Sequence, residues 1–119
     1  MSNRTSKNDI AAFNDALHDQ STTFTEDKVC KLIQNLNCIE IEKGIAESGS
    51  VNFLKSWMRI GFKVTRTMVG IATKNGNLAF LKECFADNEV ASNLMNVVES
   101  NVGENAHIQV WLDGLESQP

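Results

Sequence analysis

The chain has 119 residues, of which 42% are hydrophobic and 22% charged, with one proline and a formal net charge of −4. This composition excludes a disordered chain, and the length suits one soluble domain that buries a core without disulfide or metal support. We therefore predict a single helical domain over residues 1–119, in which residues 1–5 are disordered.

The first third of the chain predicts two amphipathic helices and a shorter third helix. Ser6 or Asn8 is a suitable cap for the first helix. Thr23 and Glu26 form a capping box before the second helix. Residues 38–42 alternate like a strand, but an isolated short strand would have no partner, so we predict a short helix there.

Residues 50–77 form the most apolar stretch, which we predict to be mainly one helix. Gly49 stops the preceding helix, Ser50 caps this one, and Asn75-Gly76 ends it in a turn. The apolar residues are too dense for a surface helix with one buried stripe, so the helix should lie at the centre of the fold. Its charged residues are all basic, and their spacing of four, four and three predicts a shared face. These basic residues are Lys55, Arg59, Lys63 and Arg66.

Three further helices are predicted, over residues 78–85, 88–102 and 106–115, with Asp87 or Asn88 as the cap of the middle one. No pair of segments has the pattern of a β-hairpin. The predicted fold class is therefore all-α, a single-domain bundle of six or seven helices around the central hydrophobic helix.

Charge is unevenly distributed along the chain. Residues 1–47 carry five basic and eight acidic side chains, residues 48–82 six basic and no acidic ones, and residues 83–119 seven acidic and no basic ones. Two interpretations stay open. The basic helix docks between acidic neighbours inside the monomer, or it presents a basic surface to phosphate or to an acidic partner.

The sequence lacks the patterns of an enzyme. His18 and His107 fall on different predicted helices, and there is no nucleophile elbow, glycine-rich phosphate loop or metal-ligand spacing. A pair of Cys84 and His107 stays open, but a buried structural cysteine is the commoner role. We expect no catalytic residues, no cofactor and no metal.

Three cysteines without a CxxC pair, at Cys30, Cys38 and Cys84, favour a reducing compartment, so we expect a cytoplasmic protein. The sequence has neither a signal-peptide core nor an apolar run of membrane-spanning length, so no transmembrane anchor is expected.

Two adjacent segments resemble homology motifs of the Bcl-2 family of apoptosis regulators. Residues 53–64 carry apolar residues at the spacing of the third motif, with Ile60-Gly61 similar to its Ile-Gly pair, although Phe62 replaces its acidic residue. Residues 74–81 are similar in position and apolar pattern to the first motif, but only Gly76 matches outright.

A third segment, residues 110–115, resembles the second Bcl-2 motif, with Trp111 followed by an aliphatic residue and Gly114. The order third, first, second along the chain is also that of the family. The resemblance implies a helical bundle with an apolar groove that binds an amphipathic helix of a pro-apoptotic protein. Such a short chain looks most like a virus-encoded inhibitor of apoptosis that acts on its host.

The candidate groove combines apolar anchors with polar residues near the position of the family's groove arginine. It consists of Trp57, Met58, Phe62, Lys74, Asn77, Leu78 and Phe80. Core packing competes with this role at every apolar position, most strongly at Trp57 and Leu78. Asn77 stands where the resemblance expects the arginine, so the charge-assisted contact would be lost unless Lys74 replaces it.

Two other functions compete with the groove. A small helical nucleic-acid binder, for example of viral double-stranded RNA, would present the basic face of residues 55–66 to phosphates, but the acidic net charge argues against nucleic acid as a partner. An acidic inhibitor that mimics nucleic acid would use residues 83–119. The sequence leaves a homodimer open.

Overall fold

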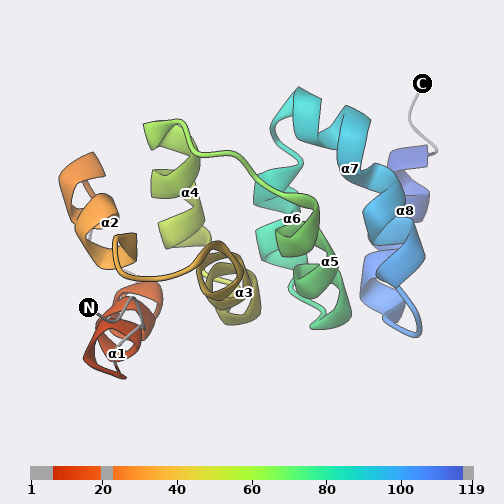
Figure 1. The fold of residues 1–119 in the computed structure, drawn as a ribbon. Helices are drawn as coiled ribbons and strands as arrows, with labels where there is room; N and C mark the ends of the chain where they lie inside the picture. The colour runs from red at the N-terminus through yellow and green to blue at the C-terminus, as the bar shows by residue number, and fades with distance from the viewer. Residues whose placement is uncertain (1–6, 20–22, 117–119) are drawn as a thin grey trace.

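The computed structural model describes residues 7–19 and 23–116, and this part of the chain contains eight α-helices and no strand (Figure 1). The helices are α1 (Lys7–Leu17), α2 (Glu26–Ile33), α3 (Cys38–Ser48), α4 (Val51–Ile60), α5 (Arg66–Lys74), α6 (Leu78–Cys84), α7 (Asn88–Asn101) and α8 (Ala106–Glu116). The all-α prediction is confirmed. Residues 1–5, predicted to be disordered, lie outside the described residues.

The helices form a bundle of hairpins that stack side by side (Figure 1). In one row α1 packs on α3, α3 on α5 and α5 on α7, and in the other α2 packs on α4 and α4 on α6. Phe85, just after α6, contacts Trp111 of α8 edge-to-face with 5.3 Å between ring centres, which adds α8 to the second row. The extents of 52 × 25 × 24 Å reflect this linear stacking.

The prediction of one central helix over residues 50–74 is wrong, and the described chain has eight helices where six or seven were predicted. Gly61 adopts φ 112° and ends α4, while its amide and that of Phe62 bond back to Met58 O and Trp57 O. Thr65 then caps α5 by accepting from Met68 N at 3.3 Å. Glycine at a left-handed position followed by a threonine cap separates two helices that a purely apolar pattern merges.

Most other predicted boundaries are confirmed. Ser50 accepts from Phe53 N at 3.1 Å, and Asp87 accepts from Glu89 N at 2.8 Å. Gly76 has φ 72°, as expected for the turn that follows α5. The cap of α2 is a correction, because Thr25 and not Thr23 accepts from Lys28 N, at 3.2 Å.

Aromatic contacts around Phe53 hold the first two hairpins together. The Phe53 side chain of α4 is fully buried, and its ring lies 5.8 Å from that of Phe13 in α1 and 5.2 Å from that of Phe24 just before α2. Trp57 continues the group at 6.5 Å. Full burial of one such side chain contributes about 1.5–3 kcal/mol, so this contact network is a main link between α1, α2 and α4.

Asparagine side chains join successive hairpins at the edge where the two helices of each hairpin meet. Asn52 Nδ2 donates to Asp19 O at 3.0 Å, Asn77 Nδ2 to Ala46 O at 2.8 Å, and Asn105 Nδ2 to Thr73 O at 3.2 Å. The acceptors Ala46 and Thr73 lie in the last turn of α3 and α5, and Asp19 lies just beyond the end of α1. The same kind of contact therefore recurs three times along the stack.

The sequence repeats in step with these hairpins. Gly44-Ile45-Ala46 in α3 recurs 26 residues later as Gly70-Ile71-Ala72 in α5. Phe53-Leu54-Lys55 in α4 recurs 27 residues later as Phe80-Leu81-Lys82 in α6. A period of this length that coincides with one helix hairpin is typical of helical repeat proteins.

The two equivalent glycines should respond oppositely to alanine. At Gly70 a Cβ would lie 3.6 Å from its nearest neighbours, so Gly70→Ala should raise the free energy of unfolding by about 0.5–1 kcal/mol through helix propensity. At Gly44 a Cβ would lie 2.7 Å from the buried Phe13 ring. Overpacking costs about 1–3 kcal/mol, so Gly44→Ala should lower the free energy of unfolding. Urea unfolding followed by circular dichroism measures both. Equal effects of the two substitutions would contradict this packing.

Candidate functional site

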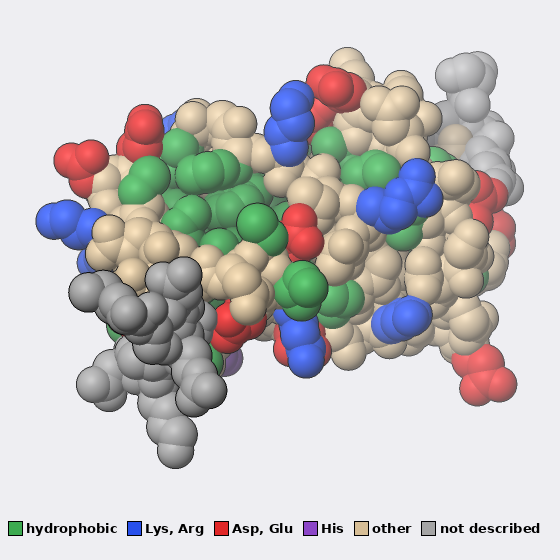
Figure 2. All heavy atoms as spheres, in the orientation of Figure 1, with side chains coloured by type: hydrophobic (Ala, Val, Ile, Leu, Met, Phe, Trp, Pro, Cys, Tyr) green, Lys and Arg blue, Asp and Glu red, His purple; other side chains and the backbone are tan. Residues whose placement is uncertain are grey.

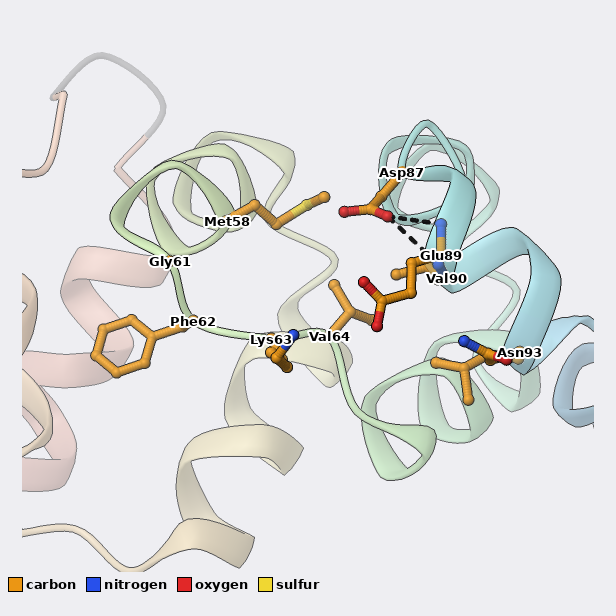
Figure 3. Close-up of a pocket in the computed structure, with 10 residues that line it drawn as sticks. Met58, Gly61, Phe62, Lys63, Val64, Asp87, Glu89, Val90 and Asn93 are labelled. Atoms are coloured by element: carbon orange, nitrogen blue, oxygen red, sulfur yellow. Dashed lines mark hydrogen bonds between the residues drawn. The ribbon is translucent and has the colours of Figure 1, made fainter.

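A surface pocket of about 330 Å³ lies between the α4–α5 linker and the first half of α7 (Figure 3). Its polar lining comes from Lys63, Asp87, Glu89 and Asn93, together with Gly61. Its apolar lining consists of Met58, Phe62, Val64, Val90 and Leu94. A concave pocket that combines apolar side chains with polar groups is a common form of binding site.

The linker side of the pocket is held in place by Trp57. The indole Nε1 of Trp57 donates to Lys63 O at 3.0 Å, and its ring stacks on Phe62 at 4.3 Å between centres. Figure 3 accordingly shows the Phe62 ring turned away from α7. Met58 near the end of α4 and Val64 of the linker therefore provide apolar side chains on this side of the pocket.

The α7 side of the pocket carries the acidic groups. One oxygen of Asp87 accepts from Glu89 N at 2.8 Å and from Val90 N at 3.4 Å, which caps α7. Figure 3 shows the other oxygen of Asp87 directed toward Met58, and Glu89 extending toward the linker. Val90 is buried and Leu94 is half-buried below them. The α7 wall of the pocket thus combines two carboxylates with two aliphatic side chains.

Hydrophobic side chains also gather on the surface over α2 and α4 (Figure 2). These elements and the linker contribute partly buried apolar residues, among them Leu32, Ile33, Ile60 and Phe62. Phe62 belongs both to this group and to the pocket lining. The pocket therefore lies next to a wider apolar area over α2 and α4.

Of the seven residues predicted to form a groove, only Met58 and Phe62 line this pocket. Phe80 is fully buried and Trp57 is 7% exposed, so both serve as core residues, as the competing interpretation expected for Trp57. Leu78 is half-buried at the start of α6. The structure does not bring the seven residues together in one groove.

Asn77 and Lys74 lie at the other end of α5 from the pocket. α5 spans Arg66–Lys74, which separates its two ends by about 13 Å along the axis. The Asn77 amide is engaged with Ala46 O, while Lys74 is exposed. The asparagine that aligned with the groove arginine is thus a link between hairpins.

The basic residues do not share one helix face, because the helix is broken. Lys55 and Arg59 belong to α4, Lys63 to the linker, and Arg66 begins α5. The Arg59 guanidinium donates to Phe24 O at 2.7 Å, which attaches α4 to the segment before α2. Within the described residues, the structure records no ion pair between these four side chains and an acidic residue.

The two histidines and the buried cysteine outside the pocket make structural contacts. His18 Nδ1 lies 2.8 Å from Asn14 O, and His107 Nε2 lies 3.0 Å from Gly76 O. Cys84 is buried in the core, and burial, with Glu83 as a second cause, raises the pKa of its thiol to about 12. No group of three metal-ligating side chains, and no helix that could span a membrane, occurs in the part of the chain that the structure describes.

Sequence reasoning missed the α7 half of the pocket, which consists of Asp87, Glu89, Val90, Asn93 and Leu94. The available signal was Gly61, whose left-handed conformation ends α4 and turns the chain toward α5. A break there creates a linker, and this linker faces the start of α7.

Comparisons of this chain with protein-family models, curated proteins and solved structures found no match.

Thiol reactivity should separate the three cysteines. Cys30 and Cys38 are exposed, so both should react with an aromatic disulfide reagent in the native protein, whereas Cys84 should react only after unfolding in urea. The absorbance of the released thiolate counts the reactive groups. Rapid native reaction of all three would contradict the burial of Cys84.

Burial of Cys84 should also make stability depend on pH. The thiol pKa is 9.0 when unperturbed and about 12 in the fold, so the unfolded chain loses this proton first. The resulting stabilisation is complete below pH 9 and declines as the pH rises toward 12. Urea unfolding across this range should show the decline, with a smaller decline in Cys84→Ala.

A structural role for Asn77 predicts a loss of stability on Asn77→Ala. Its amide makes no capping bond to α6, so alanine removes only the bond to Ala46 O, worth about 0.5–1.5 kcal/mol. Asn96, exposed on α7, provides the control because Asn96→Ala removes no bond between hairpins. Equal stability of the two variants in urea unfolding would contradict the role.

Proposed function

We propose that this protein is an interaction module that binds an amphipathic helix of another protein at the pocket between the α4–α5 linker and α7. The observation that carries the proposal is a surface pocket whose lining combines the apolar side chains of Met58, Val64, Val90 and Leu94 with charged and polar groups. An amphipathic helix buries anchors at positions such as i, i+4 and i+7 in a site of this kind. Stacked helix hairpins commonly present such surfaces to partner proteins.

Pro-apoptotic helices are the first partners that we propose, on the strength of the sequence resemblance in residues 53–64, 74–81 and 110–115. An inhibitor of apoptosis would sequester such a helix through its apolar anchors. Met58, Val64 and Leu94 at the pocket favour apolar anchors as the main source of affinity. Lys63 at the pocket rim is the basic residue nearest to a helix bound there.

Binding of nucleic acid ranks second. Lys55, Lys63 and Arg66 are exposed, but they come from three successive elements, and the Arg59 guanidinium already bonds to Phe24 O. No observation beyond charge favours phosphate contacts. Duplex RNA is therefore the appropriate negative probe in tests of the pocket.

Filling the pocket should weaken helix binding. Asn93 is exposed at the rim, so Asn93→Trp should add bulk within the pocket without disturbing the core. We expect at least about a tenfold loss of affinity, or about 1.4 kcal/mol, for a labelled pro-apoptotic helix in an anisotropy titration.

Asn96→Trp is the matched control for this experiment. Asn96 is exposed on the same helix, but it is not among the residues that line the pocket. The control should bind like the unmodified protein, and circular dichroism should show that both variants are folded. Equal losses in the two variants, or tighter binding of duplex RNA than of any helix in the panel, would refute the proposal.

A further inference from the structure

The charges around the pocket come from its two opposite walls. Lys63 comes from the α4–α5 linker, whereas Asp87 and Glu89 come from the start of α7. Glu89 and Lys63 are both exposed, and the structure records no ion pair for either of them within the described residues. A ligand that crosses the pocket would therefore meet positive charge on one side and negative charge on the other.

The acidic side is the stronger of the two. Two carboxylates face one ammonium group at the rim, and residues 83–119, which include α7 and α8, contain seven acidic and no basic residues. One Asp87 oxygen accepts both capping bonds, and the other is directed toward the pocket (Figure 3). The site therefore offers carboxylate acceptors beside its aliphatic side chains.

We infer that the partner at this pocket is an amphipathic helix whose polar flank beside α7 is basic. This inference rests on the proposed function, because it assigns the charge of the helix that the pocket would bind. The apolar stripe of the helix packs on Met58, Val64 and Leu94. Its lysine or arginine residues on one side contact Glu89 and the free oxygen of Asp87. Complementary charge of this kind mainly fixes orientation and accelerates association.

Two synthetic helices test the charge of the flank. Both are fluorescein-labelled amphipathic peptides with identical leucine anchors, and they differ only in carrying lysine or glutamate along the flank beside the anchors. Fluorescence anisotropy measures their affinity for the full chain. We expect the lysine peptide to bind about three- to tenfold more tightly, the range given by one or two exposed ion pairs. The difference should shrink as sodium chloride rises from about 0.05 to about 0.5 M.

Glu89→Lys should reverse or abolish the preference, while Glu99→Lys should retain it. Glu99 is exposed on the same helix and carries the same charge, but it does not line the pocket. Asp87→Asn keeps an oxygen that can cap α7, so it tests the second carboxylate with little risk to the fold.

The outcomes separate the inference from the function on which it rests. Equal affinity of the two peptides, or tighter binding of the glutamate peptide, overturns the basic flank and leaves the pocket as a helix site. Loss of the preference for the lysine peptide in both Glu89→Lys and Glu99→Lys also overturns the inference. The preference would then come from the net charge of α7 and not from the carboxylates at the pocket. Failure of both peptides to bind, or binding that Asn93→Trp does not weaken, refutes the pocket itself and with it the inference.

Discussion

Each hairpin of this protein leaves an apolar face that only the next hairpin can cover. The described helices are between 7 and 14 residues long, and helices of this length are marginal in water without tertiary packing. Stacking stabilises the helices of both rows, because the apolar side chains of one hairpin pack against the next hairpin. Phe53 of α4 illustrates the dependence, because its ring contacts Phe13 of α1 and Phe24 just before α2, both in the preceding hairpin.

The two edges of the stack have different properties. At the edge with the hairpin turns, Asn52, Asn77 and Asn105 bond to backbone carbonyls of the preceding hairpin, which fixes the spacing between units. At the opposite edge the linkers between hairpins are held by individual contacts, such as the bond from Trp57 Nε1 to Lys63 O. The pocket occurs at this second edge, where the chain crosses between hairpins and does not take part in the repeated asparagine bonds.

The pocket depends on residues that are distant in the chain and were not recognisable together. Met58 and Val64 flank the break at Gly61, whereas Val90 and Leu94 belong to a helix more than twenty residues later. The apolar pattern of residues 50–74 suggested continuity, and a continuous helix would have had no linker to face α7. For the same reason the four basic residues seemed to share a face, although the break assigns them to three elements.

The sequence by itself determined the helical class and most helix boundaries, because caps such as Ser50 and Asp87 and the turn at Gly76 act through neighbouring backbone groups. It also contained the repeat of Gly-Ile-Ala and Phe-Leu-Lys, which recurs with the hairpins. Only the tertiary structure decided that Asn77 and Arg59 bond to carbonyls of Ala46 and Phe24. Those partners lie more than thirty residues away, and a local pattern cannot specify a contact that depends on how hairpins stack.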